Sequence, residues 1–372
     1  MAYNKTEHLR RNIEAIRTAF ALEREQRAAT PEERDVLRAY SGFGAIKEVL
    51  EPLPHKQETA LTPLIEELHA VLKENTGGER EYKRYLDGLK ASVLTAFYTP
   101  EPVTDAIMRM LYNAGVVPVR ALEPSAGTGA FAEYLRRYNE EAEITCFEKD
   151  PLTGLILHRL HPDDTVRVQG FETIEPAYEG HFDLITSNIP FGDVSLFDPA
   201  FSSSRDPVRR QGAWAIHNYF FMKSVDLVRD GGLVAFITSQ GVADAERNRP
   251  VREWLMERCD LVAAVRLPNN LFTDHAGTEV GSDLIVLQKN SAARPLSERQ
   301  RDFIETRTLS NGITVNNSFQ SLDRVVQTSA KVGTNPYGKP AMEFTHAGGV
   351  EGIARALADM LAEDMERHFN RE

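Results

Sequence analysis

The fold of this chain is decided by one stretch, Val119-Arg120-Ala121-Leu122-Glu123-Pro124-Ser125-Ala126-Gly127-Thr128-Gly129-Ala130-Phe131. Its first half predicts a buried strand, and its second half predicts a glycine turn that leads into a helix. Glycines at 127 and 129 can take positive φ and allow a ligand to approach the backbone at the helix N-terminus. The stretch therefore predicts an α/β fold with a ligand-binding turn.

A second predicted strand, residues 142–147, is followed by Glu148-Lys149-Asp150. In a parallel sheet this places Glu148 beside the glycine turn, where it can accept both ribose hydroxyls of a nucleoside cofactor. A dinucleotide-binding fold uses a similar turn, but it prefers a third glycine where this chain has Ala132. The two strands indicate a Rossmann-like domain more than they indicate a reaction.

Another predicted strand, residues 182–186, is followed by Ser187-Asn188-Ile189-Pro190-Phe191-Gly192. A rigid Asn-x-Pro-aromatic turn at a strand's carboxyl end can aim the Asn188 amide oxygen and the Ile189 carbonyl at one NH2 group. Phe191 can then pack on the ring that carries this amine. The candidate catalytic residues are Asn188, Ile189, Pro190 and Phe191.

Phe97-Tyr98-Thr99-Pro100 lies ahead of the sheet, where Thr99 and Pro100 also predict the N-cap and first residue of a helix. With the glycine turn and the Asn-Ile-Pro-Phe run, this element resembles the motifs of S-adenosylmethionine-dependent N6-adenine DNA methyltransferases, in the γ-type order. The usual first proline of the catalytic motif is Ile189 here. That position acts in the family through its backbone carbonyl, which Ile can supply. The resemblance covers about residues 95–290, and the later elements resemble modification subunits of restriction systems.

The resemblance implies a seven-stranded methyltransferase sheet with helical N-terminal and small C-terminal extensions, and with the seventh strand inserted antiparallel. It implies methyl transfer from S-adenosylmethionine to N6 of adenine in DNA after base flipping, without a metal. The residues it implies for cofactor binding are Tyr98, Thr99, Glu123, Ser125, Ala126, Gly127, Gly129, Phe131, Glu148, Lys149 and Phe171. On the third strand of the sheet, residues 165–172, both Gln169 and Glu172 are candidates for binding the cofactor's adenine amine.

Two other functions fit the same motifs. An RNA or protein-glutamine methyltransferase also needs to clamp a planar amine or amide, and a non-catalytic scaffold that binds DNA or a partner in anti-restriction could keep the fold. The intact Glu123, Gly127, Gly129, Glu148 and Asn188 argue against the scaffold.

Three regions are expected: a helical N-terminal region at 1–90, the methyltransferase core at 91–290 and a C-terminal extension at 291–372. Leu9, Ile13, Ile16 and Phe20 recur at helical spacing in the first region. With the core, this region resembles the methylase part of large methylase-helicase proteins of mobile elements and phages. That resemblance implies a fragment of a longer protein with a helicase domain as partner, although no Gly-x-x-x-x-Gly-Lys-Ser/Thr occurs in these residues.

The connection 193–214 follows the catalytic motif and is long, which is typical of functional or disordered loops. Arg205, Arg209 and Arg210 in it suit contacts to DNA phosphates, with a mobile solvated loop as the alternative.

Net charge is −12 over 372 residues, which argues against a protein that coats nucleic acid but not against one that holds a duplex in a local cleft. Cys146 and Cys259 lie in or beside apolar strands and form no disulfide or metal framework. His158 and His161 are read as a solvated helix end and not as metal ligands. Without an apolar run of membrane length or a signal-like N-terminus, a soluble, cytoplasmic protein is expected.

Overall fold

The computed structural model describes residues 4–44, 46–50, 59–95, 97–192, 194–273, 279–334, 338 and 340–371. Asp193, the first residue of the long connection, lies outside this range.

Seven strands form the central sheet in the order β3-β2-β1-β4-β5-β7-β6. Strand β7 is antiparallel to both of its neighbours, and the other neighbouring strands are parallel. The strands are β1 (Arg120–Glu123), β2 (Glu143–Phe147), β3 (Thr165–Arg167), β4 (Phe182–Asn188), β5 (Val228–Ser239), β6 (Cys259–Leu267) and β7 (Ser282–Lys289). This arrangement confirms the predicted seven-stranded α/β fold with its antiparallel insertion.

Strand β3 is shorter than the sequence predicted, because it ends at Arg167 and not at residue 172. The Gln169 amide donates to the Arg167 carbonyl at 2.9 Å, and the Thr173 amide donates to the Gly170 carbonyl at 3.0 Å. These local bonds turn the chain into the 3-10 helix η2 (Phe171–Thr173). Phe171 therefore lies just beyond the sheet edge and is buried.

Helices cover both faces of the sheet, so alternate residues of each strand enter different cores. In β5, Leu233, Ala235 and Ile237 face one core, while Val234 and Phe236 face the other. The first core is completed by α5 (Glu101–Asn113), α6 (Ala130–Tyr138) and α15 (Gly349–His368), and the second by α10 (Ile216–Leu227) and α12 (Arg249–Arg258).

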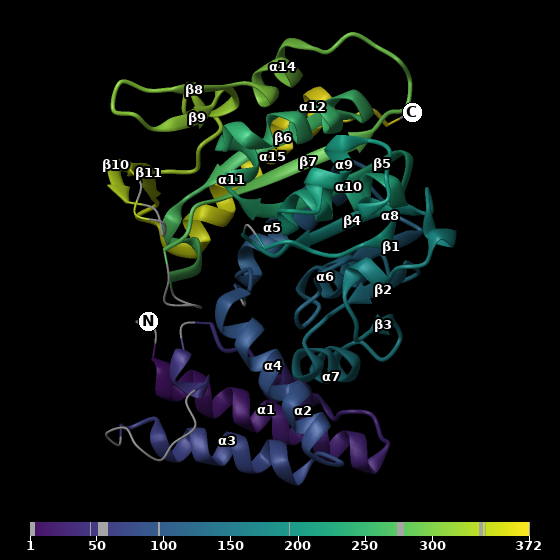
Figure 1. The fold of residues 1–372 in the computed structure, drawn as a ribbon, viewed down its shortest axis with the longest axis vertical. Coiled ribbons are helices and arrows are strands. Elements are labelled where there is room, and N and C mark those ends of the chain that lie inside the picture. Colours follow the sequence, from purple (N-terminus) through teal and green to yellow (C-terminus); the bar gives the residue numbers. More distant parts are fainter. Residues whose placement is uncertain are drawn as a thin grey trace.

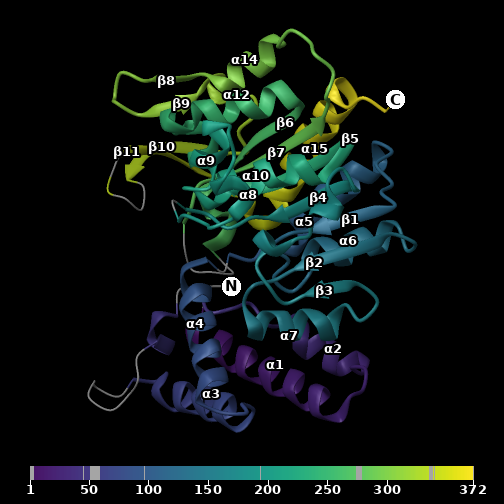
Figure 2. The same ribbon diagram turned by 45° about the vertical axis from the view of Figure 1, so that its right-hand side comes forward.

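The N-terminal helices form a separate layer at the β3 side of the sheet (Figures 1 and 2). They are α1 (Lys5–Glu25), α2 (Pro31–Arg38), η1 (Lys47–Leu50), α3 (Thr62–Glu74) and α4 (Glu79–Thr95). The predicted apolar stripe of α1 is buried in this layer, and α7 (Pro151–Leu160) of the α/β region contributes to the same core. The division at residue 90 stays a prediction, and α4 continues through it to Thr95.

The C-terminal part adds small elements and returns to the sheet. They are α14 (Glu298–Ile304), β8 (Thr306–Thr308), β9 (Thr314–Asn316), η6 (Asn317–Phe319), β10 (Ser329–Thr334), β11 (Pro340–Thr345) and α15. Helix α15 buries Ile353, Leu357 and Leu361 against α5 and β6. Although α15 has many polar residues, its apolar residues lie on one narrow face.

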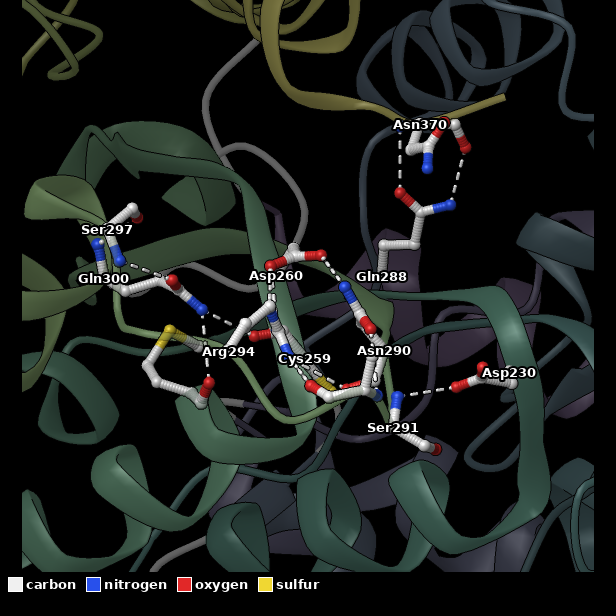
Figure 3. Close-up of polar contacts among 12 residues, drawn as sticks. Asp230, Cys259, Asp260, Gln288, Asn290, Ser291, Arg294, Ser297, Gln300 and Asn370 are labelled. Carbon is white, nitrogen blue, oxygen red and sulfur yellow. Dashed lines mark hydrogen bonds and ion pairs between the residues drawn. The ribbon is translucent and has the colours of Figure 1, made fainter. Parts of the chain in front are cut away.

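Polar contacts connect this part to β6 and β7 of the central sheet, as Figure 3 shows. Gln288 of β7 donates to the Asn370 carbonyl at 2.7 Å and accepts from the Asn370 amide at 2.9 Å. The Asp260 carboxylate of β6 accepts from Asn290 at 2.7 Å and from Arg294 at 2.8 Å. These bonds hold two segments in place. One is the segment that follows β7, and the other is the segment around Asn370, which lies beside β7.

The remaining short elements are η3 (Pro176–Tyr178), α8 (Pro199–Ser202), α9 (Pro207–Gly212), α11 (Gly241–Asp244), η4 (Glu246–Asn248) and η5 (Asn269–Phe272). No helix among the described residues is long and apolar enough to cross a membrane.

Both cysteines are free and buried. The reading of His161 as part of a solvated helix end is wrong. Its ring is buried below the glycine turn, where Nε2 donates to the Thr128 carbonyl at 3.1 Å and Nδ1 lies 3.2 Å from Asp164 Oδ2. Within the described residues, no group of three or more His, Cys, Asp or Glu side chains could hold a metal ion.

Candidate active site

A cavity of about 460 Å³ lies at the carboxyl ends of β1, β2 and β4, which is within the roughly 300–1,000 Å³ usual for ligand sites. The four candidate catalytic residues line it. So do all the candidate cofactor residues except Gly129, namely Tyr98, Thr99, Glu123, Ser125, Ala126, Gly127, Phe131, Glu148, Lys149 and Phe171. Residues from strand ends far apart in the sequence therefore meet at one cavity.

The glycine turn has the backbone that its sequence predicted. Gly127 and Gly129 have φ values of 57° and 84°. A Cβ on Gly127 would lie 2.9 Å from the Tyr98 ring, and one on Gly129 would lie 2.3 Å from His161 Nε2. Gly127 thus faces the cavity, while Gly129 allows close packing of the turn on α7.

Glu123 is buried at the end of β1, and its Oε2 accepts from the Ala132 amide at 2.9 Å. Burial raises the pKa of this carboxyl well above its usual range. The contact holds the first turn of α6 against β1, so Glu123 fixes the glycine turn from below as well as lining the cavity.

Glu148 directly follows β2, and both of its carboxylate oxygens accept from backbone amides. Oε2 accepts from the Gly127 amide and Oε1 from the Asp150 amide, each at 2.8 Å. Burial, followed by the nearby Asp150 charge, raises the pKa of Glu148 to about 7. Each oxygen keeps a second lone pair, so the carboxylate can still accept two hydroxyl hydrogen bonds.

The other cofactor candidates differ in how they are engaged. Thr99 Oγ1 is buried without a partner among the described residues, because α5 begins at Glu101 with Pro100 as its N-cap. The predicted capping role of Thr99 is therefore wrong, and its hydroxyl is available to a ligand. Lys149 Nζ lies 3.3 Å from Glu172 Oε1. Gln169 and Glu172 both line the cavity.

Asn188 uses its amide donor and leaves its acceptor open. Nδ2 donates to the Phe97 carbonyl at 2.5 Å, while Oδ1 is buried and has no hydrogen-bond partner among the described residues. The next residue, Ile189, is also buried, and its amide donates to the Ile237 carbonyl of β5 at 3.0 Å. The bond to Phe97 fixes the amide plane, so the free oxygen has a set direction.

Phe191 belongs to a group of three rings. It stacks on Phe97 with ring centroids 6.0 Å apart and planes inclined by 23°, and it meets the edge of Phe272 at 6.3 Å and 72°. Sequence analysis did not assign Phe97 or Phe272 to the site. Phe97 adjoins Tyr98 in a motif already singled out, whereas no spacing rule connects Phe272 to Phe191.

The N-terminal layer also reaches the cavity, which sequence analysis missed. Helix α4 rises from the N-terminal helices toward the sheet in both views (Figures 1 and 2) and contributes Arg84, Asp87 and Gly88 to the lining. A Cβ on Gly88 would lie 2.2 Å from Asp150 Oδ1, so this glycine permits the close approach of α4 to the end of β2.

The connection after the motif contains the short helices α8 and α9. None of its three arginines lines the cavity. Arg209 pairs with Asp226 through bonds of 2.8 and 2.7 Å and lies 4.3 Å over the Phe201 ring. Arg210 donates to the Ser204 carbonyl at 2.5 Å, and Arg205 is exposed. Arg209 thus holds the connection together.

The chain is similar to a known protein family and to several characterised proteins. A family model described as "N-6 DNA Methylase" matches residues 88–337. "Defense against restriction protein B" of Escherichia phage P1 is 27% identical over 209 residues, which are 55% of this chain and 9% of that protein. "Type II methyltransferase M.XamI" of Xanthomonas campestris pv. amaranthicola is 26% identical over 239 residues, 61% of this chain and 44% of that protein.

The chain thus spans less than half the length of either relative. Among solved structures, a modification subunit of a putative type I restriction enzyme from Vibrio vulnificus has 14% sequence identity and a TM-score of 0.47. That match covers 77% of this chain and 67% of the subunit.

Proposed function

This chain belongs to the N-6 DNA Methylase family, and from that premise we propose that it transfers a methyl group from S-adenosylmethionine to the N6 amine of adenine in DNA. The observation that carries the proposal is the buried, unpartnered Oδ1 of Asn188 at the cavity wall. A buried acceptor without a donor is unfavourable by about 1–3 kcal/mol, and at the wall of a cavity a ligand can supply that donor. An aromatic amine offers the donor that it lacks.

The amine of adenine is a weak nucleophile because its lone pair is delocalised into the ring. When Asn188 Oδ1 and the Ile189 carbonyl each accept one amine hydrogen, the lone pair becomes more localised on nitrogen. The bond from Asn188 Nδ2 to the Phe97 carbonyl keeps the acceptor oriented before the substrate arrives. Positioning of this kind replaces a random encounter and needs no covalent bond to the enzyme.

The cavity fits S-adenosylmethionine, which when bound supplies an electrophilic methyl group on a sulfonium. Glu148 has the lone pairs for two ribose hydroxyls, and the free hydroxyl of Thr99 with the Gly127 turn suits the methionine end. Gln169 or Glu172 would accept from the adenine amine of the cofactor.

A base paired in a duplex cannot reach Asn188, so the target adenine must leave the stack, which is unfavourable by a few kcal/mol. We expect Phe191 to hold the extruded base by stacking worth about 1–3 kcal/mol. The rings of Phe97 and Phe272 set the position of Phe191.

DNA is the proposed substrate, and a helicase region of a longer protein is a proposed partner. The match to only 9% of the phage P1 relative agrees with a longer protein, and the helicase itself rests on the resemblance of the sequence.

Titration calorimetry and methyl-transfer assays test the function. S-adenosylmethionine should bind, and digestion of incubated DNA to nucleosides should yield N6-methyladenine. A panel with single-stranded RNA and a glutamine-containing peptide identifies the other possible acceptors. A preference for NAD over S-adenosylmethionine, or methylation of only RNA or peptide, would contradict the proposal.

A further inference from the structure

Two aromatic side chains, those of Phe197 and Trp214, are exposed to solvent in the connection that follows the catalytic motif. Phe197 is 75% exposed and Trp214 is 67% exposed, the two highest values for large apolar side chains among the described residues. Val194, close by in the sequence, is 59% exposed. Three such side chains in one connection form a patch that folding of the chain leaves uncovered.

The backbone holds this patch at the rim of the cavity. The Leu196 amide donates to the Ala213 carbonyl at 2.9 Å, which brings the two ends of the connection together. Leu196 and Ile216 line the same cavity as Asn188, and Phe197 and Trp214 lie one and two positions from them in the chain.

Hydrogen bonds and ion pairs hold the segments that carry the patch. The buried Asp198 carboxylate accepts from the Tyr219 hydroxyl and the Ala200 amide, each at 2.7 Å, and from Lys223 at 3.3 Å. Trp254 Nε1 donates to Asp206 at 3.0 Å, close to the pair that Arg209 forms with Asp226. The rings are therefore exposed on an anchored segment and not because the segment is loose.

We propose that Phe197 and Trp214 are a DNA-contact site, where they stack on the bases next to the extruded adenine. The proposal rests on the proposed function. An extruded base leaves its neighbours with open faces, and an aromatic ring can cover such a face whatever the base. Phe197 and Trp214 adjoin Leu196 and Ile216, which line the cavity that we propose for the target base.

Ion pairing limits which arginines of the connection can meet a phosphate. Arg209, one of the three, is paired with Asp226. Base stacking is the contact that the exposed rings can add. Arg205 can still meet a phosphate.

Tryptophan fluorescence tests the site directly, because the chain has only two tryptophans and Trp254 is buried. A mixed-sequence DNA duplex should quench the emission of Trp214 in the wild-type chain, and Trp214→Phe should lose that signal. The double variant Phe197→Ala, Trp214→Ala should bind DNA about tenfold more weakly or worse, with S-adenosylmethionine affinity unchanged. Its salt dependence of DNA binding should stay as in wild type, since no phosphate contact is lost.

The matched control is Val117→Ala with Val119→Ala. These side chains are 56% and 63% exposed but precede β1, at the opposite end of the sheet from the cavity. The control should keep wild-type DNA affinity, and circular dichroism should show both double variants folded. Because the quenching experiment uses the wild-type chain, it stays decisive if a variant fails to fold.

Failure of this inference can be told apart from failure of the proposed function. Methylation of DNA with no quenching and with unchanged affinity in the double variant overturns the contact site alone. Binding and quenching by DNA without methyl transfer refutes the proposed function but supports the site. Absence of DNA binding, including a result in which the patch binds only a protein, overturns the site.

Discussion

At the scale of single residues, Asn188 separates a structural task from a chemical one. Its amide nitrogen is occupied by the Phe97 carbonyl, while its oxygen is buried and free. Aspartate at this position would keep acceptors but lose the donor that orients them. The side chain thus has one partner inside the protein and one acceptor that a donor of a ligand can satisfy.

Asn188→Ala should lower methyl transfer by about 100-fold or more, as expected for removal of an oriented transition-state contact. Binding of S-adenosylmethionine, measured by calorimetry, and DNA association should change little. Thr186→Val is a suitable control, because Thr186 Oγ1 is another buried, unpartnered atom of β4 that does not line the cavity. Wild-type methylation of DNA by the alanine variant would contradict the catalytic assignment.

Glu148 gives the site a pH dependence. Its pKa is raised to about 7 by burial, so below pH 7 the carboxyl is mainly neutral and has one acceptor fewer for ribose. Cofactor affinity should therefore rise with pH through about 7 and fall by up to about tenfold per unit below it. Calorimetry over roughly pH 5.5 to 8.5, a span that brackets this pKa, measures the step.

Glu148→Gln should bind the cofactor weakly with no such step. A step of the same size in that variant would assign the titration to another group, such as Asp150, whose pKa is also raised by burial.

At the scale of elements, the catalytic turn is an extension of strand pairing. The register that pairs Asn188 with Ile237 continues in the bond from the Ile189 amide to the Ile237 carbonyl. A proline at 189, as in the usual family motif, cannot donate this bond. Ile189 thus ties the turn to β5 where a proline would stiffen the turn itself.

Ile189→Pro should reduce the free energy of unfolding by about 1–3 kcal/mol, because the Ile237 carbonyl loses its donor. Single-turnover methylation by the folded variant should be largely kept, since the carbonyl of residue 189 remains. Ile189→Val, which keeps the amide, should lose only about 0.5–1.5 kcal/mol in denaturant unfolding. A folded proline variant without activity would show that the side chain or amide of Ile189 takes part in the reaction.

Helix α4 forms one wall of the cavity because Gly88 has no side chain. In Gly88→Ala the new Cβ would lie 2.2 Å from Asp150 Oδ1 and 3.1 Å from Pro151 Cδ. We expect displacement of α4, a loss of about 1–3 kcal/mol in stability and weaker cofactor binding. Gly77→Ala, whose Cβ would meet Glu81 at an ordinary 3.4 Å, should have neither effect. Equal melting temperatures and cofactor affinities for both variants would contradict a role for this close contact.

At the scale of the whole molecule, the N-terminal layer and the α/β region share a core. Leu152, Ile156 and Leu160 of α7 are buried with the apolar residues of the N-terminal helices, and Arg159 pairs with Glu23 of α1. Removing the layer would expose one face of α7 together with one wall of the cavity.

A fragment of residues 97–371 should therefore aggregate or bind a hydrophobic dye, and it should bind S-adenosylmethionine poorly. Adding residues 4–95 as a separate polypeptide should restore both properties at least in part. Light scattering and calorimetry measure the two effects. A monomeric fragment with the affinity of the full chain would show that the layer is an independent domain.

Local patterns in the sequence predict the sheet and most of the cavity lining. Glycine turns, strand-end acids and the Asn-Ile-Pro-Phe turn are local patterns, and the carboxyl ends of parallel strands meet at one edge of a sheet. These local patterns are therefore enough to predict that Gly127, Glu148 and Asn188 line one cavity.

Which of these atoms are free depends on contacts between distant parts of the chain. The side-chain oxygen of Asn188 is left without a partner. Arg209 pairs with Asp226, and Gly88 lies against Asp150, so each of these two contacts joins different parts of the chain. Periodicity and propensity describe short segments, so they could not separate the paired arginine from its neighbours or reveal that Phe197 and Trp214 remain in solvent. Burial and hydrogen-bond partners depend on long-range packing, and that packing is what distinguishes a residue that builds the site from one that is available to a ligand.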